Sequence, residues 1–171
     1  MTPVLETERL TLCGPELVDQ DGFTEFLMSN RAQFAGRTDD KAEAVQEYLE
    51  MIEFWKHNDL GTFVVVRKDN DRAIGHVGGL KPEGWPECEL GWSIWRDEDE
   101  GLGFASEAAI AVLYYAFGTL NWNTAVSYVA PDNKKSIKMI EKLGAALDTD
   151  ATKPKGLRCH VYRHAAPEAL Q

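Results

Sequence analysis

Cysteine is scarce in this chain of 171 residues, and its spacing is not that of a paired framework. Cys13, Cys88 and Cys159 lie far apart and form no Cys-x-x-Cys motif. An odd number of cysteines this far apart in the sequence argues against a disulfide scaffold and against a zinc ribbon. His160 and His164 lie four positions apart, but no third ligand of matching spacing is near. We therefore expect no metal site.

Long hydrophobic runs are also missing. The longest apolar stretch, residues 108–117, is far shorter than the roughly 20 residues that cross a bilayer. Residues 1–6 do not show a basic segment followed by an apolar one, which a secretory signal would have. We expect a cytoplasmic protein.

Positive charge is in short supply. The chain has 18 Lys and Arg against 28 Asp and Glu, a formal net charge of −10. A nucleic-acid or membrane surface needs basic residues to meet its phosphates, so both partners are disfavoured. The excess of acids is confined to residues 1–100, with 22 acids and 10 bases, whereas residues 101–171 have 6 acids and 8 bases. This asymmetry indicates that two parts of the chain face ligands of different charge.

The chain does have enough apolar surface for a core, since 44% of it is hydrophobic. Its length fits a single domain over residues 1–171. Apolar and polar residues alternate over 9–13, which predicts a first strand. Short strand-like runs between turn residues predict further strands over 62–67, 72–80, 87–95, 124–130, 145–149 and 157–163. Helical spacing predicts helices over 15–28, from a cap at Thr38 or Asp39 to Gly61, over 104–117 and over 133–143.

The order of these elements predicts an α/β fold built on one mixed sheet. Three strands with short links, between residues 62 and 95, indicate an antiparallel meander. The strand–helix–strand unit that follows needs a parallel crossover. We expect helices on both faces of this sheet.

The segment 89–107 has the strongest functional signal. It reads ELGWSIW, then RDEDE, then GLGFASE, which indicates a strand, a glycine turn and a helix start. Glycines let a ligand approach backbone N–H groups, and a helix N-terminus is electropositive, so a phosphate group would fit. A tight turn without a ligand explains the glycines equally well. The dinucleotide-binding fingerprint is excluded because Ser106 replaces its third glycine.

Four ordered segments resemble the GCN5-related N-acetyltransferases (GNAT). Residues 101–108 are similar to the pyrophosphate-binding motif of that family, and residues 89–95 to the strand before it. Residues 133–136 and 141–144, NKKS and EKLG, resemble the signature of the branch with the ribosomal-protein N-terminal acetyltransferases (RimJ/RimL-like). Residues 8–12 resemble the opening strand of that branch. The resemblance implies a mostly antiparallel sheet with one parallel strand pair splayed at the cofactor site.

The resemblance also implies acetyl-CoA as the acetyl donor and a cationic amine as the acceptor. Backbone N–H groups of the glycine turn would bind the pyrophosphate, and the edge of the preceding strand would pair with the pantetheine arm. The residues implied in cofactor binding are Ser93, Ile94, Trp95, Arg96, Gly101, Leu102, Gly103, Phe104, Ala105, Ser106, Asn133, Ser136 and Lys138. The branch often forms dimers, so a homodimer is one expected state.

Two residues are implied in proton transfer. Glu89 stands where the family often keeps a carboxylate, which would take the proton of the amine directly or through water. Alternatively, Glu89 would only bind a cationic substrate or a neighbouring loop. Ser136 would lie near the thiol and protonate the leaving thiolate. The acceptor could be a protein N-terminus, a polyamine, an amino acid or an aminoglycoside-like amine. The rival hypothesis is a binding module that holds acyl-CoA without turnover.

Two positions depart from the family pattern. Glu100 stands where the motif usually has Gln or Arg, and a carboxylate there would repel a pyrophosphate unless it points away. Cys13 stands where the branch usually has Arg, and we expect a buried thiol because no matched histidine accompanies it. Lys134, Lys135 and Lys138 would flank the cofactor, where each could meet the adenosine 3′-phosphate or only face solvent.

Overall fold

The computed structural model describes residues 2–167, which form one sheet of eight strands in the order β1-β2-β3-β4-β5-β6-β8-β7. The strands are β1 (Leu5–Glu6), β2 (Leu10–Cys13), β3 (Thr62–Arg67), β4 (Arg72–Leu80), β5 (Glu89–Ile94), β6 (Ala125–Val129), β7 (Ala146–Leu147) and β8 (His160–His164). Neighbouring strands are antiparallel except β5 and β6, which are parallel. The expected mixed sheet is confirmed.

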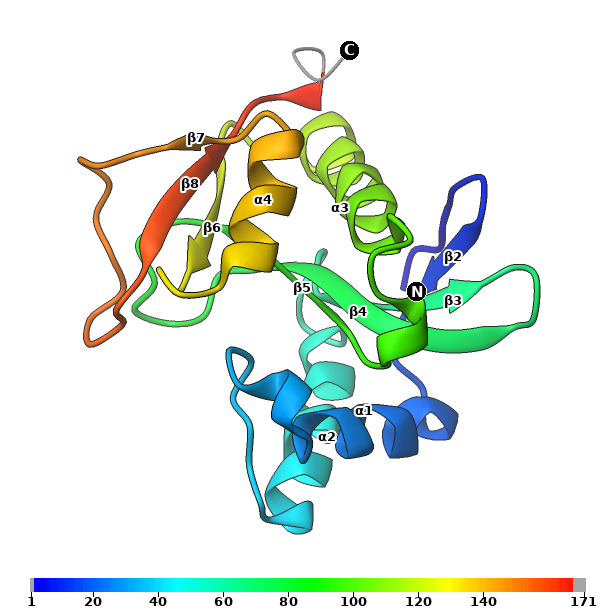
Figure 1. Cartoon of the computed structure of the whole chain (residues 1–171). Helices are drawn as coiled ribbons and strands as arrows, with labels where there is room; N and C mark the ends of the chain where they lie inside the picture. Colours follow the sequence, from blue (N-terminus) through cyan, green and yellow to red (C-terminus); the bar gives the residue numbers. More distant parts are fainter. Residues whose placement is uncertain (1, 168–171) are drawn as a thin grey trace.

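Helices cover both faces of this sheet. They are α1 (Gln20–Leu27), α2 (Lys41–Phe54), α3 (Phe104–Tyr114) and α4 (Lys134–Lys142). Figure 1 shows α1 and α2 on one face, with α3 and α4 on the other. Within residues 2–167, no helix combines the length and apolarity that crossing a bilayer requires.

Each face of the sheet packs its own apolar cluster. Between the sheet and α3 the core includes Phe63, Leu90 and Val112, all nearly inaccessible to solvent. Against α1 and α2 it includes Phe23 and Tyr48. Burial on both faces accounts for the continuous apolar run of β3.

Several boundaries differ from the sequence-based expectation. The segment expected as one helix over 15–28 contains a short 3₁₀ turn at Leu17–Asp19 and then α1. Asp40, rather than Thr38 or Asp39, caps α2, because its carboxylate accepts the Ala42 N–H at 2.8 Å.

The ends of the sheet differ from the expectation as well. Strand β1 was missed, since two residues are too few to show an alternation. The strand expected at 157–163 begins only at His160, because Leu157 N–H closes a turn onto Pro154 C=O at 3.2 Å.

Candidate active site

The glycine turn before α3 leaves backbone N–H groups open to a ligand. Gly101 and Gly103 have φ angles of 77° and 85°, a region that residues with a side chain rarely adopt. Within residues 2–167 no side chain caps α3, and the N–H groups of Phe104, Ala105 and Ser106 have no partner within the helix. A Cβ added at Gly101 would meet nothing within 4 Å. This open, electropositive helix start suits an anionic group.

Strands β5 and β6 pair at their beginnings and then separate. A single register pair, Glu89 with Val126, joins them. A continued parallel ladder would bond Tyr128 N–H to Leu90 C=O. Instead, Ser127 Oγ donates to Leu90 C=O at 2.6 Å, and the Glu89 carboxylate accepts the Tyr128 N–H. Side chains thus satisfy the backbone groups that the splay releases.

Ser127 is itself fixed by a buried histidine. Its hydroxyl proton is used on Leu90, so the Nε2–H of His164, 2.8 Å away, must donate to Ser127 Oγ. Burial lowers the pKa of His164 to about 4, so the ring stays neutral at physiological pH. Ser127 and His164 were not among the predicted site residues, because their contact depends on the pairing of β6 with β8.

The backbone N–H and C=O groups of β5 point alternately towards β4 and towards the side that has separated from β6, here called the open edge. Trp95 N–H donates to Ile74 C=O at 2.8 Å and therefore faces β4. By the alternation of an antiparallel ladder, Ser93 also faces β4, whereas Trp92 and Ile94 face the open edge. The open edge therefore presents the backbone of Ile94, which is among the residues expected to pair with the cofactor, and of Trp92, which is not, whereas Ser93 and Trp95 face β4.

The remaining side chains at the end of β5 are turned into the protein. The Trp95 indole is 4% exposed and donates to His76 Nδ1 at 2.9 Å. The Arg96 guanidinium donates to Ala73 C=O at 3.2 Å. Both side chains hold the end of β5 against β4, so they fix the point from which the glycine turn starts.

The start of α4 lies beside the glycine turn. Lys135 Nζ is 2.6 Å from Glu100 Oε1, which ties the first turn of α4 to the residue before the glycines. The Asn133 side-chain oxygen caps α4 by accepting the Ser136 N–H at 3.2 Å, so its amide nitrogen is the group left to donate. Ser136 is half-buried and Lys138 is exposed.

Glu100 is held by cations from two sides. Besides Lys135, Arg31 lies within 2.8 Å of its carboxylate. These two cations hold the pKa of Glu100 below its usual range. The rest of the acidic run is also paired: Asp97 with Arg31, Glu98 with Arg72, and the buried Asp99 with Arg67 and Arg72. The carboxylate that departs from the family pattern is thus neutralised where a pyrophosphate would bind.

Glu89 is a half-buried carboxylate at the point where β5 and β6 separate. Burial raises its pKa to about 7, although the bond from Tyr128 N–H acts in the opposite direction. Glu87 is bound by Arg163 at 2.6 Å, whereas Glu89 has no ion pair among residues 2–167. A Cβ added at Gly91 would meet only Glu89 Oε1, at 4.0 Å, so the space above Gly91 is open. Such a group can take up a proton near neutral pH.

The family of this chain follows from its similarity to known proteins. Residues 9–146 match the family profile described as an acetyltransferase (GNAT) domain. The chain belongs to the GNAT acetyltransferase family. The glycine turn and the splay of β5 from β6 are therefore parts of a GNAT enzyme, a transferase that moves acetyl groups.

Individual relatives agree with this assignment. The uncharacterized N-acetyltransferase p20 of Bacillus licheniformis is 31% identical over 92% of each chain. An acetyltransferase crystal structure from Agrobacterium tumefaciens strain C58 has a TM-score of 0.88 at 34% identity, covering 95% of this chain and 94% of that one. A ribosomal-protein-S5-alanine acetyltransferase from Vibrio fischeri has a TM-score of 0.71 at 21% identity, covering 99% of each, and shares the fold.

Cys13 lacks the properties of a nucleophilic thiol. It is half-buried in β2, and burial, with smaller contributions from Asp19 and Glu16, raises the pKa of its thiol to about 11. A thiol of that pKa stays protonated at neutral pH. Among residues 2–167, no cluster of three or more His, Cys, Asp and Glu side chains is arranged to hold a metal ion.

The raised pKa of Glu89 predicts a stability change in the variant Glu89→Gln. Because the folded pKa of about 7 exceeds the ordinary 4.5, the folded protein binds more protons between these pH values, and stability falls as pH rises through them. Glutamine has no such titration. Thermal unfolding at pH 5 and pH 8 should show a larger loss of Tm in the wild type than in the variant. Equal losses would contradict a buried Glu89 carboxyl.

Proposed function

We propose that this protein is an acetyl-CoA-dependent N-acetyltransferase that transfers the acetyl group directly to a primary amine. One observation carries the proposal: an open strand edge runs between a glycine turn with exposed N–H groups and the Glu89 carboxylate, which has no ion pair among residues 2–167. The open edge at Trp92 and Ile94 runs from Glu89, at the start of β5, towards the glycine turn beyond its end. An extended acyl-CoA lying along this edge would place its two ends near these two groups.

The residues present fit the polar parts of acetyl-CoA. The free N–H groups of the glycine turn suit its pyrophosphate. The edge N–H and C=O groups of Trp92 and Ile94, with the Asn133 amide, match the amides of the pantetheine arm. Lys138 is exposed on α4, where its charge can meet the 3′-phosphate. When bound, acetyl-CoA supplies the activated thioester.

The chain contributes proton transfer and charge stabilisation to the reaction. Glu89 takes a proton from the substrate ammonium, directly or through water, so that a neutral amine attacks the thioester carbonyl. A backbone N–H on the open edge of β5 stabilises the oxyanion that develops there. The Ser136 hydroxyl gives its proton to the departing thiolate and regains one from solvent.

The acceptor in this proposal is a cationic amine. The Glu89 carboxylate, which has no ion pair within residues 2–167, and the acidic character of residues 1–100 both favour a positively charged substrate. The NKKS and EKLG segments and the shared fold of the Vibrio fischeri protein support the RimJ/RimL-like branch, and with it a protein N-terminus or a small amine as acceptor. The same acidic balance disfavours nucleic acid and membrane as partners. The proposed location is the cytoplasm, and a homodimer is one of the states open to the protein.

Acetyl-CoA is expected to stabilise the protein and to be consumed with an amine. A ligand at 100 times its Kd adds about 2.7 kcal/mol to the free energy of unfolding, which raises Tm by several degrees. Thiol release should then appear with at least one amine from a panel of N-terminal peptides, polyamines, amino acids and aminoglycosides. Stabilisation without thiol release on any amine would favour a binding module. No stabilisation by acetyl-CoA or CoA would contradict both hypotheses.

A further inference from the structure

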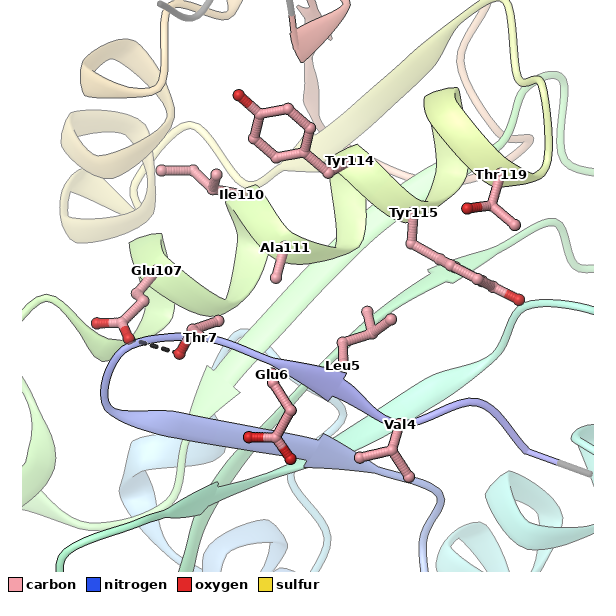
Figure 2. A pocket seen from close by; sticks show the side chains of 10 residues that line it. All are labelled: Val4, Leu5, Glu6, Thr7, Glu107, Ile110, Ala111, Tyr114, Tyr115 and Thr119. Carbon is pink, nitrogen blue, oxygen red and sulfur yellow. Dashed lines mark hydrogen bonds between the residues drawn. The ribbon is translucent and has the colours of Figure 1, made fainter.

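The turn between β1 and β2 is hydrogen-bonded to the first turn of α3. Thr7 Oγ1 donates to Glu107 Oε1 at 2.6 Å, and the Arg9 backbone N–H donates to the same oxygen at 2.9 Å. The Arg9 side chain donates from Nε to Glu107 Oε2 at 2.7 Å, and its NH2 lies at the same distance from this oxygen. Figure 2 shows Thr7 directed at the Glu107 carboxylate from the neighbouring chain segment. Both oxygens of Glu107 are therefore bound to this one turn.

The same guanidinium reaches the glycine turn. Arg9 NH1 donates to Leu102 C=O at 3.0 Å, and its guanidinium carbon lies 4.6 Å from the centroid of the Phe104 ring. In a planar trans peptide the C=O and the N–H point in opposite directions. The bond to Leu102 C=O therefore turns the Gly103 N–H away from Arg9. The next peptide is fixed as well, because Glu107 N–H donates to Gly103 C=O at 3.0 Å.

We propose that Thr7 and Arg9 are positioning residues for the acyl-CoA site. Acting through Glu107 and the Leu102 carbonyl, they hold the Gly103 N–H in the orientation that binds the pyrophosphate. This inference rests on the proposed function. A turn with two glycines samples many conformations when it is free. The bonds of Thr7 and Arg9 to Glu107 and Leu102 C=O, here called the brace, restrict this turn. They therefore lower the conformational entropy that the turn loses when CoA binds.

The chemistry of this brace explains why the side chain is arginine. A guanidinium presents its donors in a fixed planar fork, which here spans a carboxylate and a carbonyl at once. A lysine keeps the charge and most of the stem but presents a single donor centre. A lysine at position 9 therefore cannot bond the Glu107 carboxylate and Leu102 C=O in the same way at once, whereas the positive charge beside the turn is kept. This is the purpose of the variant Arg9→Lys.

Lys68 offers a matched control because it holds the same β1–β2 turn from another side. Its Nζ lies 2.6 Å from Thr7 C=O and 2.6 Å from Glu6 Oε2. Within the described chain, neither of these bonds reaches the glycine turn or α3. Lys68→Ala loosens the β1–β2 turn at Thr7 C=O but leaves the bonds of the Thr7 and Arg9 side chains to Glu107 and Leu102 in place.

The test compares CoA binding in the full-length wild type and in the variants Arg9→Lys, Arg9→Ala, Thr7→Val and Lys68→Ala. By calorimetry, we expect both Arg9 variants to raise the Kd for CoA about tenfold and Thr7→Val about threefold, as for lost hydrogen bonds to a charged partner. Lys68→Ala should stay within about twofold of the wild type. Without CoA, amide hydrogen exchange at Glu107, whose N–H donates to Gly103 C=O, should accelerate in the Arg9 variants only. KM for acetyl-CoA should follow Kd while kcat changes little.

The possible outcomes distinguish failure of the positioning role of Thr7 and Arg9 from failure of the proposed acetyltransferase function. If Arg9→Lys and Thr7→Val bind CoA as tightly as the wild type, Thr7 and Arg9 are structural and the inference is overturned. If Lys68→Ala weakens binding as much as Arg9→Ala, general loosening of the β1–β2 turn explains the effect, which also overturns it. If the folded wild type does not bind CoA, the proposed function itself is wrong and the inference falls with it.

Discussion

Replacing Glu89 with glutamine is expected to lower kcat about 100-fold at pH 7 with a primary amine as substrate, the lower end of what general-base catalysis contributes. Glutamine retains the size of glutamate and a carbonyl oxygen that can still accept the Tyr128 N–H. It cannot take up a proton. Because the beginning of β5 stays paired with β6 through backbone bonds, the loss reports on proton transfer rather than on folding.

The pH profile supplies the specific signature of Glu89. With a pKa of about 7, the wild-type carboxyl should ionise as pH rises through neutrality, and kcat/KM should rise with it. This inflection should be absent in Glu89→Gln, and the deficit should shrink towards pH 10, where the amine loses its proton unaided.

Glu87→Gln provides the matched control for this profile. Glu87 lies two residues earlier but is bound by Arg163, and this cation holds the pKa of its carboxyl below the usual range. Its replacement should leave the inflection near pH 7 in place. An inflection that persists in Glu89→Gln would exclude Glu89 as the base and leave it the role of substrate anchor.

Gly103→Ala is expected to weaken CoA binding by about 10- to 100-fold, as for lost hydrogen bonds to charged phosphates. Its φ of 85° costs a residue with a side chain roughly 1–2 kcal/mol. The added Cβ would also lie 3.4 Å from Arg9 NH2, in the brace that orients the turn. Relief of this strain rotates the peptides whose N–H groups face the pyrophosphate. Calorimetry with CoA measures the loss.

Gly156→Ala separates backbone strain from ligand binding. Gly156 has a φ of 80°, and an added Cβ there would meet nothing within 4 Å. It lies in the loop between β7 and β8, which Figure 1 shows well apart from the start of α3. This variant should lose a similar amount of thermal stability and retain the wild-type Kd for CoA. Wild-type CoA binding by Gly103→Ala would contradict the assignment of the turn.

The main elements of the fold could be predicted because each shows its own periodicity. Strands β3 and β4 lie at the predicted residues because two strand-like runs flank a four-residue polar turn. The short β1 and the division of the first helical segment could not be predicted, since a few residues show no period. Glycine spacing together with the family resemblance located the turn at Gly101 and Gly103.

Contacts between distant parts of the chain could not be predicted. Glu100 looked unfavourable to a pyrophosphate because its partners Arg31 and Lys135 come from other segments. The grip of Arg9 on Glu107 depends equally on how β1 and β2 lie beside α3. The acidic run at 97–100 binds arginines of the same acidic half of the chain, so these pairs neutralise the run locally and leave the charge asymmetry between the two halves unchanged.

Acetyl transfer to an amine is tested most directly by mass spectrometry of the amine panel after incubation with the enzyme and acetyl-CoA. We expect one acetylated amine, free CoA in equal amount, and strongly reduced formation of both with Glu89→Gln at pH 7. Release of CoA without an acetylated amine, or no product from any amine with a folded enzyme that binds acetyl-CoA, would contradict an N-acetyltransferase built on this site.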